Sequence, residues 1–128
     1  MPDRPDVPDE MIDRIRAMAA DLPECHEERA WVGTRWRVAG RTVAHVFGGE
    51  DGIFRITLRG DPEDVAAFEH LGPPYFRTEW GRNVIGMMLG DESTWAATDW
   101  DEVGELVTIS YLVQAPRRLK DEVSPDVP

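Results

Sequence analysis

The chain has 128 residues, 14 basic and 25 acidic side chains, and a net charge of −11 at pH 7. This length suits one domain with a real hydrophobic core, and the acidity argues against general binding to polyanions such as DNA. The sequence has no apolar run near the roughly 18 residues of a membrane helix, no secretory signal, and a single cysteine, which excludes an internal disulfide or a multi-cysteine zinc site. We therefore expect a cytoplasmic protein.

The first predicted element is a helix that follows a flexible lead-in over residues 1–8. Asp9 is expected to cap this helix, and Pro23 ends it. Its apolar positions recur at helical spacing and form one stripe. These positions are Met11, Ile12, Ile15, Met18, Ala19 and Leu22.

A run of strands is predicted next. Residues 34–38 and 41–47 alternate around Ala39-Gly40, which predicts a hairpin, and the pattern allows an earlier strand over 28–32. The glycines of 48–52 predict a second turn. A further strand over 53–59 is expected to bury alternate side chains, which are Phe54, Ile56 and Leu58.

A second helix is predicted to begin at Asp61-Pro62 and to end at Gly72. Its expected buried stripe consists of Val65, Phe68 and Leu71. Pro73-Pro74 then predicts an extended loop through residue 83. A strand over 84–89 and a short strand-like piece over 94–97 complete this region.

The last predicted helix begins after Asp99, with Glu102 placed as in a capping box, and ends before Pro116. Residues 121–128 are expected to be a disordered tail. The whole pattern predicts one α+β domain over 9–120, in the order α-β-β-β(β)-α-β(β)-α. Its antiparallel sheet would carry the helices on one face, giving two layers.

Residues 31–60 are net basic within this acidic chain. Strand alternation places the arginines in pairs on common faces, so they could form a positive surface on the helix-free side of the sheet. The alternative is that they neutralise acids elsewhere in the fold. The candidate nucleic-acid contacts are Arg35, Arg37, Arg41, Arg55 and Arg59.

The segment over 75–83 is rich in aromatic and polar side chains. Aromatic side chains supply much contact area at recognition surfaces, which suggests a ligand or partner site. The alternative is a loop that its aromatic residues hold against the core. The candidate partner-binding residues are Tyr75, Phe76, Trp80, Arg82 and Asn83.

Nothing in the sequence predicts catalytic residues, a metal site or a cofactor. Cys25 and His26 are adjacent, so on a strand their side chains would point to opposite faces. The neighbouring glutamates would also disfavour a thiolate. The glycine-rich turn over 48–52 contains two acids and no lysine, which does not suit phosphate binding. We expect a monomer or a weak homodimer.

Four short motifs resemble the MmcQ/YjbR family. Residues 36–44 (WRVAGRTVA) are similar to its hairpin, although Arg41 stands where lysine is common. Residues 80–87 (WGRNVIGM) are similar to its WG-x-N-x-x-G-M strand, and residues 98–119 to its closing helix and "SY…APKKL" ending. Leu22-Pro23-Glu24 occupies the position of its LPE break.

This resemblance implies the same two-layer α+β fold. It also implies DNA binding, because the family's fold is similar to the double-wing DNA-binding domain of a phage transcription activator. A protein partner is the other implied ligand, because the fold is also similar to bacterial secretion chaperones. No enzymatic reaction or cofactor is implied.

Overall fold

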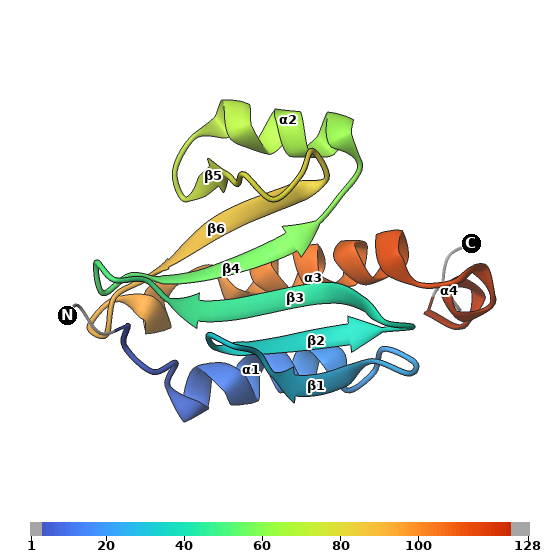
Figure 1. The fold of residues 1–128 in the computed structure, drawn as a ribbon, viewed down its shortest axis with the longest axis horizontal. Coiled ribbons are helices and arrows are strands. Elements are labelled where there is room, and N and C mark those ends of the chain that lie inside the picture. The colour runs from blue at the N-terminus through green and yellow to red at the C-terminus, as the bar shows by residue number, and fades with distance from the viewer. Residues whose placement is uncertain (1–3, 124–128) are drawn as a thin grey trace.

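The computed structural model describes residues 4–123, which form an antiparallel sheet with helices packed against one of its faces (Figure 1). This arrangement confirms the predicted two-layer α+β fold. The strands are β1 (His26–Arg29), β2 (Thr34–Val38), β3 (Arg41–Gly48), β4 (Phe54–Arg59), β5 (Tyr75–Arg77) and β6 (Val84–Gly90). The helices are α1 (Asp9–Ala19), α2 (Pro62–Leu71), α3 (Trp100–Gln114) and α4 (Arg117–Val123), with a short 3-10 helix η1 (Trp95–Ala97).

The sheet has the strand order β1-β2-β3-β4-β6-β5, and every neighbouring pair is antiparallel. The hairpin predicted around Ala39-Gly40 is confirmed, with both residues at positive φ. The sheet lies in front of α1 and α3 in Figure 1, so its viewed face carries no helix in the described part of the chain.

The hydrophobic core lies between the sheet and the helices. Helix α3 packs on β3 and β4, and α1 packs beside α3. The predicted stripe of β4 is confirmed, since Phe54, Ile56 and Leu58 are all buried. Trp36 is buried at the centre of β2 and Tyr111 in α3, where its hydroxyl donates to the Pro23 carbonyl at 2.7 Å.

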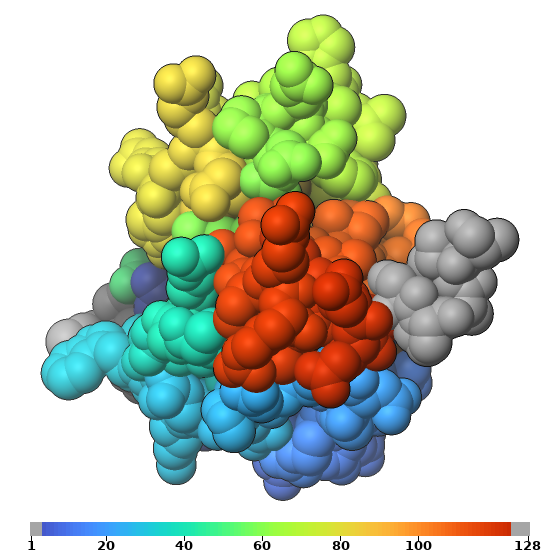
Figure 2. Space-filling model, turned by 90° about the vertical axis from the view of Figure 1, so that its right-hand side faces the viewer, coloured from blue at the N-terminus to red at the C-terminus, as the bar shows by residue number. Residues whose placement is uncertain are grey.

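Helix α4 was not predicted, because Pro116 was interpreted only as the end of α3. Pro116 instead precedes a new helix, and its carbonyl accepts from the N–H of Leu119 at 3.0 Å. Leu119 is buried, and Arg118 bonds Glu24 at 2.7 Å. Figure 2 shows α4 covering the end of the molecule beside the β2–β3 hairpin. The predicted tail is therefore wrong for residues 121–123, and 124–128 lie outside the described residues.

The predicted lead-in over residues 1–8 is also shorter than expected, although residues 1–3 lie outside the described part. Arg4 donates to the Gly48 carbonyl at 3.1 Å, and its guanidinium lies 6.0 Å from the centre of the Phe47 ring. Pro5 packs so closely on Gly48 that an added Cβ there would meet the Pro5 carbonyl oxygen at 2.2 Å. The segment before α1 is thus held against the sheet.

Several other boundaries differ from the predictions. Asp9 is the first residue of α1 and Pro8 is its cap, so the predicted Asp9 cap is wrong. The first strand covers 26–29 and not 28–32, and Leu71, the last residue of α2, is exposed and not buried as predicted. Residues 95–97 form η1, in which buried Trp95 packs edge-on against Trp100 at 5.9 Å between ring centres.

Candidate ligand-binding face

One row of residues crosses all six strands on the helix-free face of the sheet. Each residue of this row is paired with the next one in the register of the sheet. Because side chains alternate along a strand, the row lies on the other face of the sheet from the core residues. We call this surface, with the side chains that pack on it, the open face. The row is Glu28, Arg35, His45, Thr57, Gly86 and Phe76.

Two of the predicted arginines lie on the open face and share one carboxylate. Arg35 donates from Nε to Oε1 of Glu28 at 2.5 Å, and Arg37 donates from Nη1 to the same oxygen at 3.3 Å. These arginines lower the pKa of Glu28, mainly through the Arg35 hydrogen bond. Arg37 also donates to the Gly40 carbonyl. Both side chains are therefore held along β1 and β2, with part of their charge neutralised.

Arg55 is paired as well. Its guanidinium donates to both carboxylate oxygens of Asp51, at 2.9 and 2.7 Å, and this contact holds the pKa of Asp51 well below its usual range. The guanidinium also lies 5.8 Å from the centre of the Phe76 ring. Arg55 thus joins the glycine turn after β3 to Phe76 of β5.

The other two predicted arginines lie away from this cluster. Arg41 is exposed at the end of the β2–β3 hairpin. Arg59 lies at the end of β4, where it contributes to the lining of a cavity of about 210 Å³ between α2, α3 and the sheet. Burial lowers the pKa of its guanidinium. The structure therefore brings Arg35 and Arg37 together, and it places Arg55 two strands away with a carboxylate of its own.

The predicted aromatic segment meets the open face through two side chains. The ring of Trp80, 59% exposed, lies 6.1 Å from that of Phe47, which in turn lies 5.0 Å from the ring of His45. Phe76 covers Gly86, where an added Cβ would come within 2.3 Å of the Phe76 ring. Trp80 and Phe76 are thus in contact with the sheet, while Trp80 still presents a large area to solvent.

The remaining residues of that set have other roles. Tyr75 lies on the helix side, where its ring packs 4.8 Å from that of Phe68 and where burial, together with Glu102, raises its pKa. The Asn83 carbonyl accepts from the N–H of Gly60 at 2.9 Å, and Arg82 is exposed. Part of this segment is strand β5, so the prediction of a loop throughout 73–83 is wrong.

Sequence reasoning missed Phe47 and Gly86 as parts of this surface. Strand alternation is enough to predict that Phe47 lies on the opposite face from Val46. The contact of Phe47 with Trp80 could not be predicted in this way, because it joins segments far apart in the chain. His45 is half-buried, and its Nε2 donates to the Val32 carbonyl at 2.6 Å. Burial, with a smaller contribution from Arg35, lowers the pKa of His45.

The Cys25 side chain is half-buried, and burial raises the pKa of its thiol to about 11. A thiol with this pKa is protonated at neutral pH and is a poor nucleophile. Residues 4–123 contain no cluster of three or more histidine, cysteine or carboxylate side chains suited to a metal ion. Within the same range, every helix is too short or too polar to cross a membrane.

Comparison with known protein families shows to which family this chain belongs. The family model described as YjbR matches residues 20–113. The chain belongs to the YjbR family. The matched region holds most of the open face, from β1 through β6, together with most of α3.

A solved structure has the same fold as this YjbR chain. It is the crystal structure of Deinococcus radiodurans protein DR2400, with the family-model domain DUF419, and it aligns with a TM-score of 0.63 at 20% sequence identity. The alignment covers 91% of each chain, so the likeness extends over nearly the whole fold. No curated protein matches the sequence.

Proposed function

We propose that this YjbR-family protein is a binding module that recognises a segment of a partner protein on its open face. The observation that carries the proposal is the contact between Trp80 and Phe47, which holds an exposed aromatic side chain against β3 at the residue that pairs with Arg55 of β4. Tryptophan and arginine are the residues that contribute most at protein interfaces. Here the arginine belongs to strand β4, and the tryptophan lies in the segment between β5 and β6 with its ring against Phe47 of β3.

The ion pairs favour a protein partner over DNA. Phosphate binding draws its affinity from arginines and lysines that neutralise phosphates. On the open face, Arg35 and Arg37 already share Glu28, and Arg55 already pairs with Asp51. A net charge of −11 adds long-range repulsion of polyanions. A partner segment with apolar and polar side chains does not need unpaired arginines, and the net charge of the protein does not repel it.

Two tryptophans provide a matched test. Trp80 and Trp31 are both exposed, but only Trp80 has its ring against Phe47. Partners would be identified by crosslinking to the tagged full-length protein, and binding would then be measured with each purified partner. We expect Trp80→Ala to weaken that binding at least about tenfold, as for an interface hot spot, and Trp31→Ala to leave it nearly unchanged. Equal effects of the two variants would refute the assignment to the open face.

Nucleic-acid binding is the second candidate, and one observation supports it. The strands are rich in arginine, whereas acids are concentrated in α1, α2 and α3 on the other layer. The strand arginines are Arg29, Arg35, Arg37, Arg41, Arg55, Arg59 and Arg77, against the strand acids Glu27 and Glu28. Surface ion pairs are weak, so phosphates could displace the carboxylates.

A short labelled DNA duplex at low salt tests this candidate by fluorescence anisotropy. Binding that decreases steeply with salt and is lost in Arg37→Glu/Arg55→Glu would establish nucleic-acid binding on the open face. Arg117→Glu/Lys120→Glu on α4 is the control for net charge, because it makes the same charge change outside the strands. The partner-protein proposal predicts no salt-sensitive binding of this duplex by the wild-type protein.

A further inference from the structure

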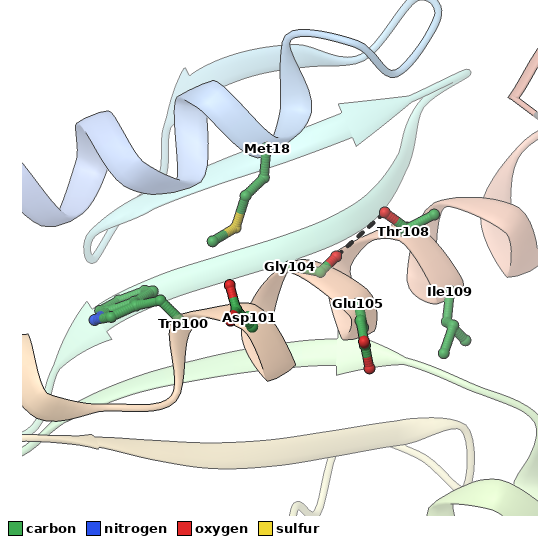
Figure 3. A pocket seen from close by; sticks show the side chains of 7 residues that line it. All are labelled: Met18, Trp100, Asp101, Gly104, Glu105, Thr108 and Ile109. Atoms are coloured by element: carbon green, nitrogen blue, oxygen red, sulfur yellow. Dashed lines mark hydrogen bonds between the residues drawn. The ribbon is translucent and has the colours of Figure 1, made fainter.

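We propose that a second surface, the groove between α1 and α3, docks a basic amphipathic helix of a partner protein. The groove has a volume of about 810 Å³ and lies on the helix layer, away from the open face. Figure 3 shows Met18 reaching over it from α1 and Trp100 to Ile109 following it along α3. This proposal stands independently of the open face and of whatever ligand binds there.

The floor of the groove is set by a glycine in the middle of α3. Glycine is a poor helix former, because it loses more backbone freedom on folding than other residues. The fold does not require it at this position: a Cβ on Gly104 would meet only the flexible end of Met18, at 3.8 Å or more. Because Gly104 has no side chain, the groove between the two helices is deeper at this position.

The rest of the floor is compatible with an apolar ligand. The Thr108 hydroxyl donates to the Gly104 carbonyl at 3.2 Å, so its polar hydrogen is already satisfied within α3. Met18 and Trp100 are half-buried, and Ile109 is 46% exposed. These three side chains provide apolar contacts along the groove. Within residues 4–123, no helix or strand covers them.

The charges of the groove select a basic occupant. Asp101 and Glu105 are the charged residues of the lining; both are exposed, and neither forms an ion pair within residues 4–123. They lie four residues apart on α3 and therefore project from the same side. A facing helix with lysine or arginine at the same spacing would pair with both. The nearby cation Arg14 is engaged by Trp100, 5.4 Å from its ring centre.

The dimensions select a short helix. The lining of α3 runs from Trp100 to Ile109, and nine helical steps of 1.5 Å span about 14 Å, or two to three turns. An amphipathic helix that binds in a groove uses apolar anchors at positions i, i+3 or i+4, and i+7, which span about 10 Å and therefore fit within this length. The predicted occupant thus has three apolar anchors on one side and flanking lysines or arginines.

The test uses a synthetic helical peptide with leucine anchors at that spacing and flanking lysines, and the same peptide with glutamates in place of lysines. Binding to the full-length protein is measured by anisotropy of the labelled peptide. We expect saturable binding of the lysine peptide that weakens with salt, and at least about tenfold weaker binding by Gly104→Leu and by Asp101→Lys/Glu105→Lys. Gly104→Ala, which fits without any rearrangement, keeps the fold intact and should weaken binding less than leucine does.

The control is Glu63→Lys/Asp64→Lys, which makes the same charge change on exposed acids of α2. Equal weakening by this control would mean general attraction to an acidic protein and would overturn the proposal. Equal binding of the lysine and glutamate peptides would also overturn it. If the wild type dimerises and Gly104→Leu abolishes the dimer, the occupant is a second copy of this chain and the proposed partner is wrong.

Discussion

The hydroxyl of Ser110 accepts a hydrogen bond from the backbone N–H of Arg59 at 2.8 Å. The same hydroxyl donates to the carbonyl of Val43. Pairing between β3 and β4 ends at Ala44 and Leu58, so Val43 and Arg59 would form the next antiparallel pair. A side chain of α3 therefore bridges the two strands where their backbones no longer bond each other, and it ties the helix layer to the sheet.

We predict that Ser110→Ala lowers the free energy of unfolding by about 1–3 kcal/mol. The substitution removes the partner of a buried donor and of a buried acceptor, and each unpaired group carries a desolvation penalty. Urea unfolding monitored by circular dichroism measures the change. Thr108→Ala in the same helix is the control, because the Thr108 hydroxyl bonds only a carbonyl of its own helix. This substitution should lower the free energy of unfolding by less than Ser110→Ala does. A loss as small as that of Thr108→Ala would contradict the bridge.

We predict that Gly86→Ala destabilises the protein by about 1–3 kcal/mol. An added Cβ would overlap the Phe76 ring at 2.3 Å, so β5 must shift on β6, and overpacking of a close contact costs this much. Unfolding of the single and double variants with Phe76→Ala gives a double-mutant cycle. The clash predicts that Gly86→Ala costs much less once Phe76 is alanine. Additive effects of the two substitutions would show that the ring is not what requires glycine.

We predict that Gly104→Ala raises the free energy of unfolding by about 0.5–1 kcal/mol. Alanine is the better helix former, and its methyl group would make an ordinary contact with Met18 at 3.8 Å. The expected rise in Tm is about 2–5 °C for a chain of this size, measured by calorimetry. A lower Tm would mean that α1 and α3 need the glycine for packing, which would remove the reason for assigning it to the groove.

The sequence was sufficient to predict the strands from Thr34 to Arg59, because clean alternation and the Ala39-Gly40 turn act locally. It also gave the start of α3, where the Asp99 side chain accepts from the N–H of Glu102 at 3.1 Å. Strand β5 was missed because three residues after two prolines give too short a pattern. Its strand character depends on pairing with β6, which lies later in the chain.

The candidate site was predicted only in its parts. Alternation placed Arg35 and Arg37 on one face, but their neutralisation by Glu28 depends on the register between β1 and β2, which no local pattern specifies. The contact between Trp80 and Phe47 likewise requires the order of strands in the sheet. Charge counting along the chain therefore overestimated the free positive charge of the open face.

The last prediction concerns pH. Burial lowers the pKa of His45 below its ordinary value of 6.5, so below about pH 6.5 the unfolded chain takes up a proton that the folded protein does not. Stability should therefore decrease as the pH falls from about 7.5 to about 5.5, measured by urea unfolding. Carboxylates with lowered pKa, such as those of Glu28 and Asp51, lose their contribution only at lower pH, near and below their ordinary values of 4.5 and 3.8.

The variant His45→Gln isolates this contribution, because glutamine retains a side-chain N–H for the Val32 carbonyl and does not titrate. Its stability should decrease less than that of the wild type over the same interval. Equal decreases in the two proteins would show that protonation of His45 does not oppose folding, and hence that the open face tolerates a charged imidazole beside Arg35.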